Sequence, residues 1–321
     1  MVAMAGPAKG TGIATRDAYG EVLAQLGAEN PDIVVLDADL SPSTKTSVFA
    51  KKFPDRFFDV GIAEQNLIGV AAGLSFEGKI PFASSFAIFL AGRPWEQIRN
   101  MVCHSGANVK IVATHAGITV GEDGASHQML EDIAIMRAIP RMRVIHPADG
   151  PSTQKIIRAV ASDFGPVYVR LSRPKFPVIY DDSYAFRMGK GTTLREGKDC
   201  AIIAAGLEVS EALKAADSLK AEGIDAAVID MACIKPLDEA LVESYARKCG
   251  AIVTAEEHNI LGGLGGAVCE CVASRYPVPV VRVGTKDTFG ESGDVPSLME
   301  KYGLTSRHIA DAARAAVRMK R

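Results

Sequence analysis

The sequence predicts an α/β protein with two open, mostly parallel-sheet domains. Short runs of apolar and β-branched residues, such as Asp32–Asp37 and Lys110–Thr114, alternate with helix-like segments along most of the chain. The runs are apolar throughout their middle rather than at alternate positions, which is typical of strands buried on both faces of a parallel sheet. The alternation breaks once, between Ser172 and Gly197, and then resumes. The chain therefore divides into two sheets, each covered by helices on both faces.

The composition is that of a globular protein with a large core. The 321 residues are enough for about two domains. Hydrophobic residues make up 48% and charged residues 23%, and the net charge of −2 argues against a partner such as nucleic acid or a membrane surface. The six cysteines form no Cys-x-x-Cys pair, so we expect no disulfide framework, no metal bound by this chain and a cytoplasmic location. We also expect no signal peptide and no membrane span.

The first domain is predicted over residues 13–174, after a Gly-, Ala- and Pro-rich N-terminus over 1–12 that we expect to be flexible. Thr15 can cap a helix over 16–26, whose apolar face includes Val22 and Leu23. Strands follow at 32–37, 57–60, 81–86, 110–114, 143–146 and 166–171. The intervening helices are predicted from Glu64 to Leu74, from Arg93 onward, over 128–138 and over 151–162.

The second domain is predicted over residues 197–321. The segment 175–196 is the expected linker, because it is irregular and rich in proline and charge. Beyond it, strands are predicted at 200–204, 226–230, 251–255 and 278–283, and helices at 210–222, 238–248, 262–273 and 306–319. The string Gly263-Leu-Gly-Gly-Ala lacks the third glycine of a dinucleotide-binding fingerprint, so a helix packed closely on a strand is its simpler interpretation.

One carboxylate, Glu64, opens a segment that is otherwise small or apolar. Every residue from Leu67 to Leu74 is Leu, Ile, Val, Ala or Gly, which predicts a buried helix, and Gly61 provides the turn before it. A carboxyl group at the start of a buried helix is costly unless it has a partner or a chemical task. The alternative is that Glu64 merely favours the positive end of the helix dipole.

Polar and aromatic side chains gather after the carboxyl ends of the predicted strands, where open α/β sheets bind ligands. These loops supply Asp39, Ser43, Glu64, Phe86, Phe89, His115, Asp123, His127 and Arg173. The phenylalanines could stack on an aromatic ligand or pack in the core. The histidines could bind a polar substrate or have a structural role. The arginine could bind a phosphate or could simply lie on the surface. Their convergence on one edge favours a ligand site.

Three segments carry a resemblance to a known family. They are Ile62-Ala-Glu-Gln-Asn, Gly121-Glu-Asp-Gly-Ala-Ser-His-Gln and Leu171-Ser-Arg-Pro, and together they resemble the C-terminal half of a transketolase over nearly the whole chain. The Gly-Glu-Asp-Gly-x-x-His-Gln string is the specific one, since thiamine-diphosphate enzymes in general share only the Ile-Ala-Glu-like segment. The resemblance implies a thiamine-diphosphate pyrimidine-binding domain followed by a transketolase C-terminal domain.

The resemblance also implies roles for the residues at the shared edge. Glu64 would be the catalytic acid that hydrogen-bonds the aminopyrimidine ring of thiamine diphosphate and promotes loss of its C2 proton. The rest of the cofactor site would be Asp39, Ile62, Phe86 and Phe89. Substrate hydroxyls would be contacted by Asp123 and by a catalytic His127, and the sugar phosphate by Arg16, Ser43, His115 and Arg173. His258 matches a position whose role is unassigned.

The sequence lacks the Gly-Asp-Gly…Asn motif through which the family holds the diphosphate and its Mg²⁺ or Ca²⁺. The resemblance therefore implies the smaller subunit of a split transketolase. Such a subunit shares its cofactor with a diphosphate-binding N-terminal subunit, in an α2β2 assembly with homodimer contacts. It would transfer a ketol unit from a ketose phosphate to an aldose phosphate, by default in pentose-phosphate recycling.

Departures from the family pattern are Gly92, where some relatives carry tyrosine, and Ala125-Ser126 in place of the more usual Pro-Thr. The alternatives are the β subunit of a 2-oxoacid dehydrogenase, a fragment of a deoxyxylulose-phosphate synthase and a non-catalytic partner subunit that keeps only the fold.

Overall fold

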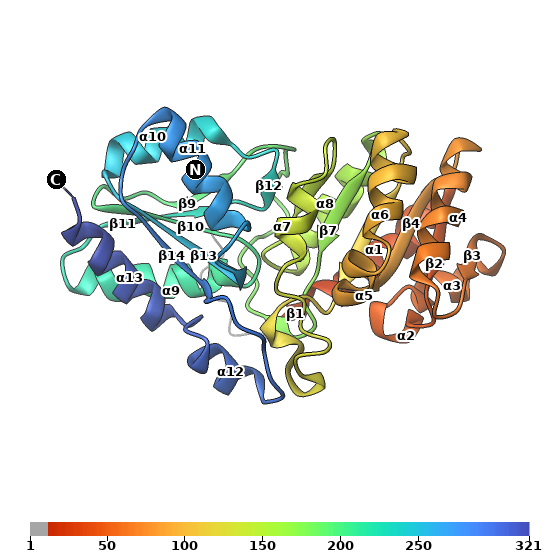
Figure 1. Ribbon diagram of the computed structural model, residues 1–321, viewed down its shortest axis with the longest axis horizontal. Coiled ribbons are helices and arrows are strands. Elements are labelled where there is room, and N and C mark those ends of the chain that lie inside the picture. Colours follow the sequence, from red (N-terminus) through yellow and green to blue (C-terminus); the bar gives the residue numbers. More distant parts are fainter. Residues whose placement is uncertain (1–11, 321) are drawn as a thin grey trace.

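The computed structural model describes residues 12–320, in which two lobes lie side by side along the long axis (Figure 1). Each lobe contains one main sheet, and most neighbouring strands in both sheets are parallel, so the predicted fold class is confirmed. The flexible N-terminus predicted over 1–12 falls, apart from Gly12, outside the described residues. Within residues 12–320, no helix is both long enough and apolar enough to cross a membrane.

The first domain is built on a seven-stranded sheet in which only the pair β12–β6 is antiparallel. Its order is β12 (Cys233–Lys235), β6 (Arg143–Ile145), β7 (Val167–Arg170), β5 (Lys110–Thr114), β4 (Ile80–Phe86), β2 (Ile33–Asp37) and β3 (Phe57–Asp59). Successive residues of β2 enter two different hydrophobic cores, Ile33 on one face and Val34 on the other. Both faces are buried, which explains the uninterrupted apolar runs of the sequence.

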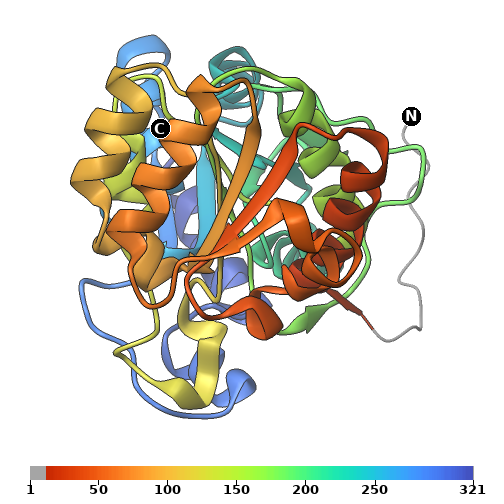
Figure 2. The ribbon, with the colours of Figure 1, turned by 90° about the vertical axis from the view of Figure 1, so that its right-hand side faces the viewer.

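Helices cover both faces of this sheet (Figure 2). On one face lie α1 (Thr15–Glu29), α3 (Ser47–Lys52) and α8 (Gly150–Ser162). On the other lie α4 (Glu64–Phe76), α5 (Ala87–Gly92), α6 (Trp95–Gln97), the π-helix η2 (Ile98–His104) and α7 (Asp132–Arg137). Helix α8 begins with a capping box, in which the Asp149 carboxylate accepts from the Ser152 N–H and the Ser152 hydroxyl accepts from the Asp149 N–H.

The second domain is built on a five-stranded sheet that is parallel except at one edge. Its order is β14 (Val280–Thr285), β13 (Ile252–Asn259), β10 (Cys200–Ala204), β11 (Ala226–Asp230) and β9 (Thr192–Arg195). One face is covered by α9 (Glu208–Ala221) and α13 (Ser306–Arg318), and the other by α10 (Glu239–Cys249) and α11 (Leu264–Arg275). The core under α10 and α11 is continuous with the core under α4 and α7 of the first domain.

The two domains also share strands. The predicted linker over 175–196 contains β8 (Lys175–Phe176), which pairs with β1 (Ile13–Ala14) of the first domain, and β9 of the second sheet. Strand β12, from the second half of the chain, forms the edge of the first sheet beside β6. Short strands of this kind carry too few residues to show a period in the sequence, so the prediction missed them.

Two expectations about helices are wrong. The helix predicted over 128–138 is confined to α7, because the Gln128 side chain is engaged inside the preceding loop, where it donates to the Ile118 carbonyl. Helix α4 is not buried on all sides: Leu67 and Ile68 are fully buried, but Gly73 and Phe76 are exposed. Short elements that the sequence did not predict include α3 and α5, and also α2 (Ser41–Thr44), the 3₁₀ helices η1 (Pro54–Arg56) and η3 (Ile118–Asp123), and α12 (Val295–Lys301).

Candidate active site

The loops at the carboxyl ends of the parallel strands bring the predicted residues to one edge of the first sheet. After β3, Gly61 has a φ of 72°, which lets the chain turn sharply into α4 and its first residue, Glu64. Phe86 ends β4, and His115 follows β5 directly. Neighbouring parallel strands end at the same edge, so these separate segments meet there.

Glu64 is a buried carboxylate with one ionic partner. Its side chain is 4% exposed, and its Oε1 accepts a hydrogen bond from Nη1 of Arg93 at 2.8 Å. The guanidinium carbon of Arg93 lies 4.2 Å from the centroid of the Phe89 ring. Arg93 therefore links the carboxylate to the aromatic wall of the site. The sequence indicated Arg93 only as a helix start, although a buried acid calls for a nearby cation.

The aromatic rings of the site form one connected group. Phe86 and Phe89 are nearly parallel, with ring centroids 6.0 Å apart and an interplanar angle of 12°. His115 stacks on Phe86 at 3.8 Å, and His127 meets the edge of Phe89 at 5.4 Å. The predicted aromatic pair therefore lies between the two predicted histidines, and this arrangement can receive a flat ring.

A cationic group borders these rings. Nη1 of Arg16 donates to Nε2 of His115 at 2.9 Å and to the Ser43 carbonyl at 3.2 Å. Because arginine only donates, Nε2 of His115 is the unprotonated nitrogen, and Nδ1–H donates to the Thr114 hydroxyl at 2.8 Å. Burial, and then the charges of Arg16 and Arg173, lower the pKa of His115 to about 3. His115 is therefore neutral at pH 7, and the net positive charge here comes from the arginines.

Arg173 lies on the exposed side of this group. It donates through Nη1 to the Val120 carbonyl and to Glu122 Oε2, the latter at 2.9 Å. A hydrogen bond from the Glu122 backbone to its own carboxylate, and then the hydrogen bond and charge of Arg173, lower the pKa of Glu122. A pocket between Arg16, Arg173 and Lys175, also lined by Thr119, has a volume of about 270 Å³. The pocket is open to solvent and is also lined by Asp17 and Glu122, so its three cations exceed its two acids by one charge, and this surplus suits an anionic group.

Three predicted residues stand apart from this arrangement. Asp39, Ile62 and Asp123 are exposed, and within residues 12–320 no side-chain hydrogen bond joins them to the group above. Asp39 has a φ of 61°, and its backbone N–H donates to Asp59 Oδ1. Ser43 takes part only through its carbonyl oxygen.

A buried polar network behind the site was missed by the sequence reasoning. Nε of Arg170 donates to both oxygens of Asp132, at 3.2 and 2.9 Å, and the Tyr168 hydroxyl donates to Oδ2 at 2.8 Å. Nη2 of Arg170 donates to the carbonyl of Glu257 at 2.9 Å. Arg170 lies in an otherwise apolar strand, and a charge in a predicted buried strand is the signal that could have revealed the network.

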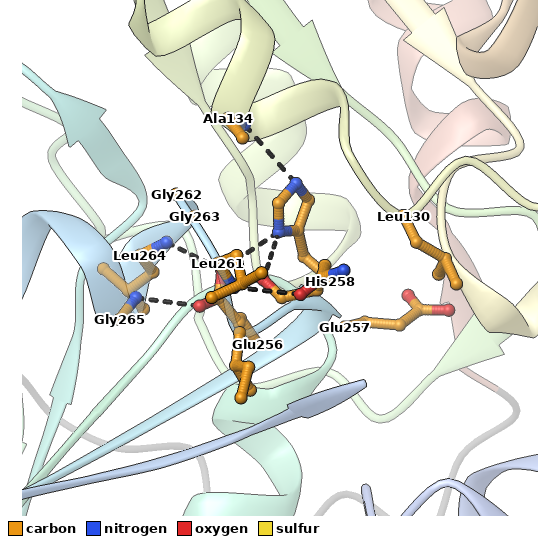
Figure 3. Close-up of polar contacts among 12 residues, drawn as sticks. Leu130, Ala134, Glu256, Glu257, His258, Leu261, Gly262, Gly263, Leu264 and Gly265 are labelled. Atoms are coloured by element: carbon orange, nitrogen blue, oxygen red, sulfur yellow. Dashed lines mark hydrogen bonds and ion pairs between the residues drawn. The ribbon is translucent and has the colours of Figure 1, made fainter. Parts of the chain in front are cut away.

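Strand β13 of the second domain carries three consecutive polar side chains, Glu256, Glu257 and His258 (Figure 3). Glu256 accepts from the backbone N–H groups of Leu264 and Gly265 at the start of α11. Nε2 of His258 lies 3.4 Å from the Ala134 N–H in α7. Between them, Glu257 points away from Glu256 and towards the first domain. His258, whose role the sequence left open, is thus a contact between the two domains.

These two domains match known family models. Residues 11–178 match the pyrimidine-binding domain of transketolase, and residues 189–309 match the transketolase C-terminal domain. The fold and the site therefore define a transketolase-type chain, and the protein belongs to the transketolase family. More narrowly, it corresponds to the C-terminal subunit of split transketolases.

The relatives that match over nearly their whole length support the narrower assignment. The putative transketolase C-terminal section of Methanocaldococcus jannaschii is 53% identical over 313 residues, 97% of each chain. A 6-deoxy-6-sulfo-D-fructose transketolase subunit of Clostridium sp. is 43% identical over 93% of this chain and 92% of its own. Human transketolase is 38% identical, but only 50% of its length is covered.

Solved structures agree. A split gene transketolase, an inactive beta4 tetramer, superposes with a TM-score of 0.89 at 55% identity, over 97% of this chain and all of that one. The transketolase of Leishmania mexicana superposes with a TM-score of 0.81 at 28% identity, over 97% of this chain and 46% of its own.

Proposed function

We propose that this chain is the catalytic C-terminal subunit of a transketolase that transfers a two-carbon ketol unit from a ketose phosphate to an aldose phosphate. The observation that carries the proposal is the position of Arg16 and Arg173 beside the rings and the histidines that border Glu64. A cationic pocket next to a carboxylate and an aromatic wall suits a phosphorylated sugar beside a flat cofactor ring.

The side chains present fit the aminopyrimidine ring of thiamine diphosphate, the cofactor of the family. Phe86 and Phe89 offer nearly parallel ring faces, and Glu64 offers a buried hydrogen-bond acceptor. Arg93 contacts both Phe89 and Glu64 and is half-exposed, so a bound ring would replace its guanidinium there. When bound, thiamine diphosphate supplies a stabilised carbanion for making and breaking carbon–carbon bonds.

The chain's own residues would bind and orient the reactants. Glu64, shielded from water, would hold a proton at the pyrimidine ring nitrogen. His127, at the edge of the phenylalanine rings, would meet the substrate hydroxyls together with Asp123, and Asp39 and Ile62 would complete the cofactor site. Neutral His115 and the two arginines would hold the phosphate.

The proposal includes a partner chain that holds the diphosphate and its Mg²⁺ or Ca²⁺ in an α2β2 assembly. Support comes from the exposed side of α4 and the loop before it, where Ile62 is 75% and Phe76 60% exposed. The surface at Gly73 is also open, because a Cβ at this position would have no atom within 4 Å. Apolar surface of this kind beside a catalytic residue suits coverage by another subunit. A cytoplasmic location is consistent with six free cysteines.

The proposed substrates are pentose phosphates and related sugar phosphates. Two relatives are named for other sugars, 6-deoxy-6-sulfo-D-fructose and apulose 4-phosphate. Both sugars carry an anionic group on a small carbohydrate, so the arginine pocket would suit either class. A panel of donors that differ only in that group tests the preference directly.

The decisive experiment is Glu64→Gln, assayed for ketol transfer with the partner subunit, thiamine diphosphate and Mg²⁺. Loss of a general acid–base group lowers rates by about 10²–10⁴-fold, which is the expected loss here. Glu77→Gln, at the exposed end of α4, is the matched control and should keep full activity.

The same assay separates the alternatives. Activity unchanged by Glu64→Gln would favour a non-catalytic partner subunit. Release of CO₂ from a 2-oxo acid without ketol transfer would favour a 2-oxoacid dehydrogenase subunit or a deoxyxylulose-phosphate synthase fragment. Full ketol transfer by this chain in the absence of the partner would contradict the shared cofactor site.

A further inference from the structure

The loop over residues 115–128 carries both histidines of the candidate site and has little regular structure of its own. It contains only η3, and Gly117, Gly121 and Gly124 adopt φ values of 85°, 79° and 76°. Backbone of this kind does not hold a single shape without outside contacts. The contacts that fix the loop therefore decide where His115 and His127 lie.

First-domain contacts hold part of the loop, since Ala116 N–H donates to the Leu171 carbonyl and Arg173 to that of Val120, and two further groups of contacts come from the second domain. At its far end, Nε2 of Gln128 donates to the Glu291 carbonyl at 2.9 Å and to the loop carbonyls of Ile118 and Gly121. In both views the loop runs beside the segment that leads into α12, near the bottom of each picture (Figures 1 and 2). At its near end, the contact is made by Glu257 of β13.

The Glu257 side chain enters the loop itself. Its Oε1 accepts a hydrogen bond from the backbone N–H of Thr119 at 2.5 Å. A Cβ at position 117 would lie 2.2 Å from Cδ of Glu257, so only glycine permits this approach. Arg170 holds the Glu257 backbone in place through the carbonyl of that residue. The side chain is fixed at its base and contacts the loop at its tip.

Because it is buried, the carboxyl of Glu257 destabilises the fold, so stability alone does not explain why this residue is present. Its side chain is fully buried, and Oε2 has no hydrogen-bond partner among residues 12–320. Glu208, also fully buried, interacts unfavourably with Glu257, and neither of its oxygens has a partner in this part of the chain. A buried carboxyl with one hydrogen bond destabilises the fold relative to an apolar residue of similar size. A role beyond packing accounts for its presence.

We propose that Glu257 is a positioning residue: from the second domain it holds residues 117–121, and through them the neighbouring His115, in the geometry that binds the sugar phosphate. The C-terminal domain thereby takes part in donor binding without touching the substrate. This inference rests on the proposed function for its kinetic part and on the loop geometry alone for its structural part.

The test compares Glu257→Ala and Glu257→Gln with Glu208→Gln. The control replaces a buried carboxyl that makes no hydrogen bond to the loop. The first readout is amide hydrogen exchange of this chain without substrate. In Glu257→Ala we expect exchange over 117–121 to accelerate about tenfold or more, the effect of losing one buried hydrogen bond. Residues 124–128, held by Gln128, should exchange as in the unchanged protein. Glu257→Gln keeps an oxygen acceptor and should restore most of the protection.

The second readout is steady-state kinetics with the partner subunit. Glu257→Ala should raise KM for a ketose phosphate about tenfold, with kcat and the half-saturating thiamine diphosphate concentration changed less than twofold. Unchanged exchange over 117–121 would refute the positioning role. So would equal losses in KM, kcat and cofactor saturation that Glu208→Gln reproduces, since those would reflect general destabilisation. If no variant, nor the unchanged protein, transfers a ketol unit, the proposed function fails, while the exchange experiment still decides the role of Glu257.

Discussion

Replacing Arg173 by alanine tests whether the cationic pocket recognises the phosphate of the substrate. In the structure the Arg173 side chain is about one-third exposed, and its guanidinium donates to the Val120 carbonyl and to Glu122. A hydrogen bond between charged groups contributes about 1.5–3 kcal/mol, and partial exposure favours the lower part of that range. At about 1.4 kcal/mol per factor of ten, KM for a phosphorylated donor should rise roughly 10–30-fold.

The assay measures KM for a ketose phosphate and for the same ketose without its phosphate, using the complete two-subunit enzyme. Only the phosphorylated donor should be affected in Arg173→Ala. The matched control is Arg307→Ala on α13, which removes an arginine from another exposed arginine–glutamate pair and should change neither KM. Glu122→Gln supplies the opposite perturbation, because Glu122 competes with a phosphate for Arg173 and its removal should lower KM for the phosphorylated donor.

Equal increases in KM for both donors would refute the reasoning, because they would show that Arg173 acts by shaping the loop through Val120. A rise in KM on Glu122→Gln would point the same way, since a freed arginine should bind phosphate better. The sugar-phosphate assignment of Arg16 and His115 would then need another source of support.

Two predictions concern stability. Asp132→Asn breaks a fully buried ion pair with Arg170 and should lower the free energy of unfolding by about 3–5 kcal/mol in urea titrations. Asp163→Asn weakens the ion pair with Arg143, in which the Asp163 side chain is half-exposed, and should cost less than about 1 kcal/mol. Similar losses in the two variants would contradict the reasoning. Burial raises the pKa of Glu257 to about 7, above its unfolded value, so the native state keeps a proton that the unfolded chain releases and stability falls as pH rises through 7. Between pH 6 and 8 this loss of stability is about 1.4 kcal/mol. The free energy of unfolding of Glu257→Gln should therefore rise by that amount relative to the unchanged protein over the same range. A difference between the two proteins that stays constant with pH would refute the prediction. The ionisable groups around Glu257 are Arg170, Asp132 and Glu208. Of these, only Glu208, whose pKa is also raised by burial, could add to the fall of stability with pH.

The sequence predicted the parts of the fold that depend on local pattern. Long apolar strands such as β2 and β10 are within a residue or two of their expected bounds, because buried parallel strands produce continuous apolar runs. Strand β12 and the strands inside the predicted linker were missed, because they form by pairing with distant segments and not by local preference. Helix α4 was expected to be buried throughout, because its apolar residues show no polar face. The apolar residues of α4 that remain exposed form a surface that this chain does not cover.

The candidate site was predicted where chemistry-bearing residues follow strands, and it was incomplete where partners come from elsewhere. Glu64, Phe86, Phe89, His115 and Arg173 each lie at or after the carboxyl end of a strand of the first sheet, so the rule for open α/β sheets placed them at one edge. Arg93 was missed because its role depends on the orientation of a helix against Glu64. Glu257 was missed because it lies 138 positions from Thr119 in the sequence, and only the packing of the two domains brings them together.

These contacts explain why the two domains behave as one structural unit. A single hydrophobic core passes from the helices of the first domain to those of the second, and β12 extends the first sheet with residues from the second half of the chain. Glu257 adds a contact that ends in the loop of the candidate site. Separating the domains would expose that core, remove an edge strand and release the loop together. The exposed side of α4 differs, because covering it with another chain disturbs none of these contacts. Coverage of the exposed side of α4 by another subunit is therefore compatible with these contacts, whereas separation of the two domains is not.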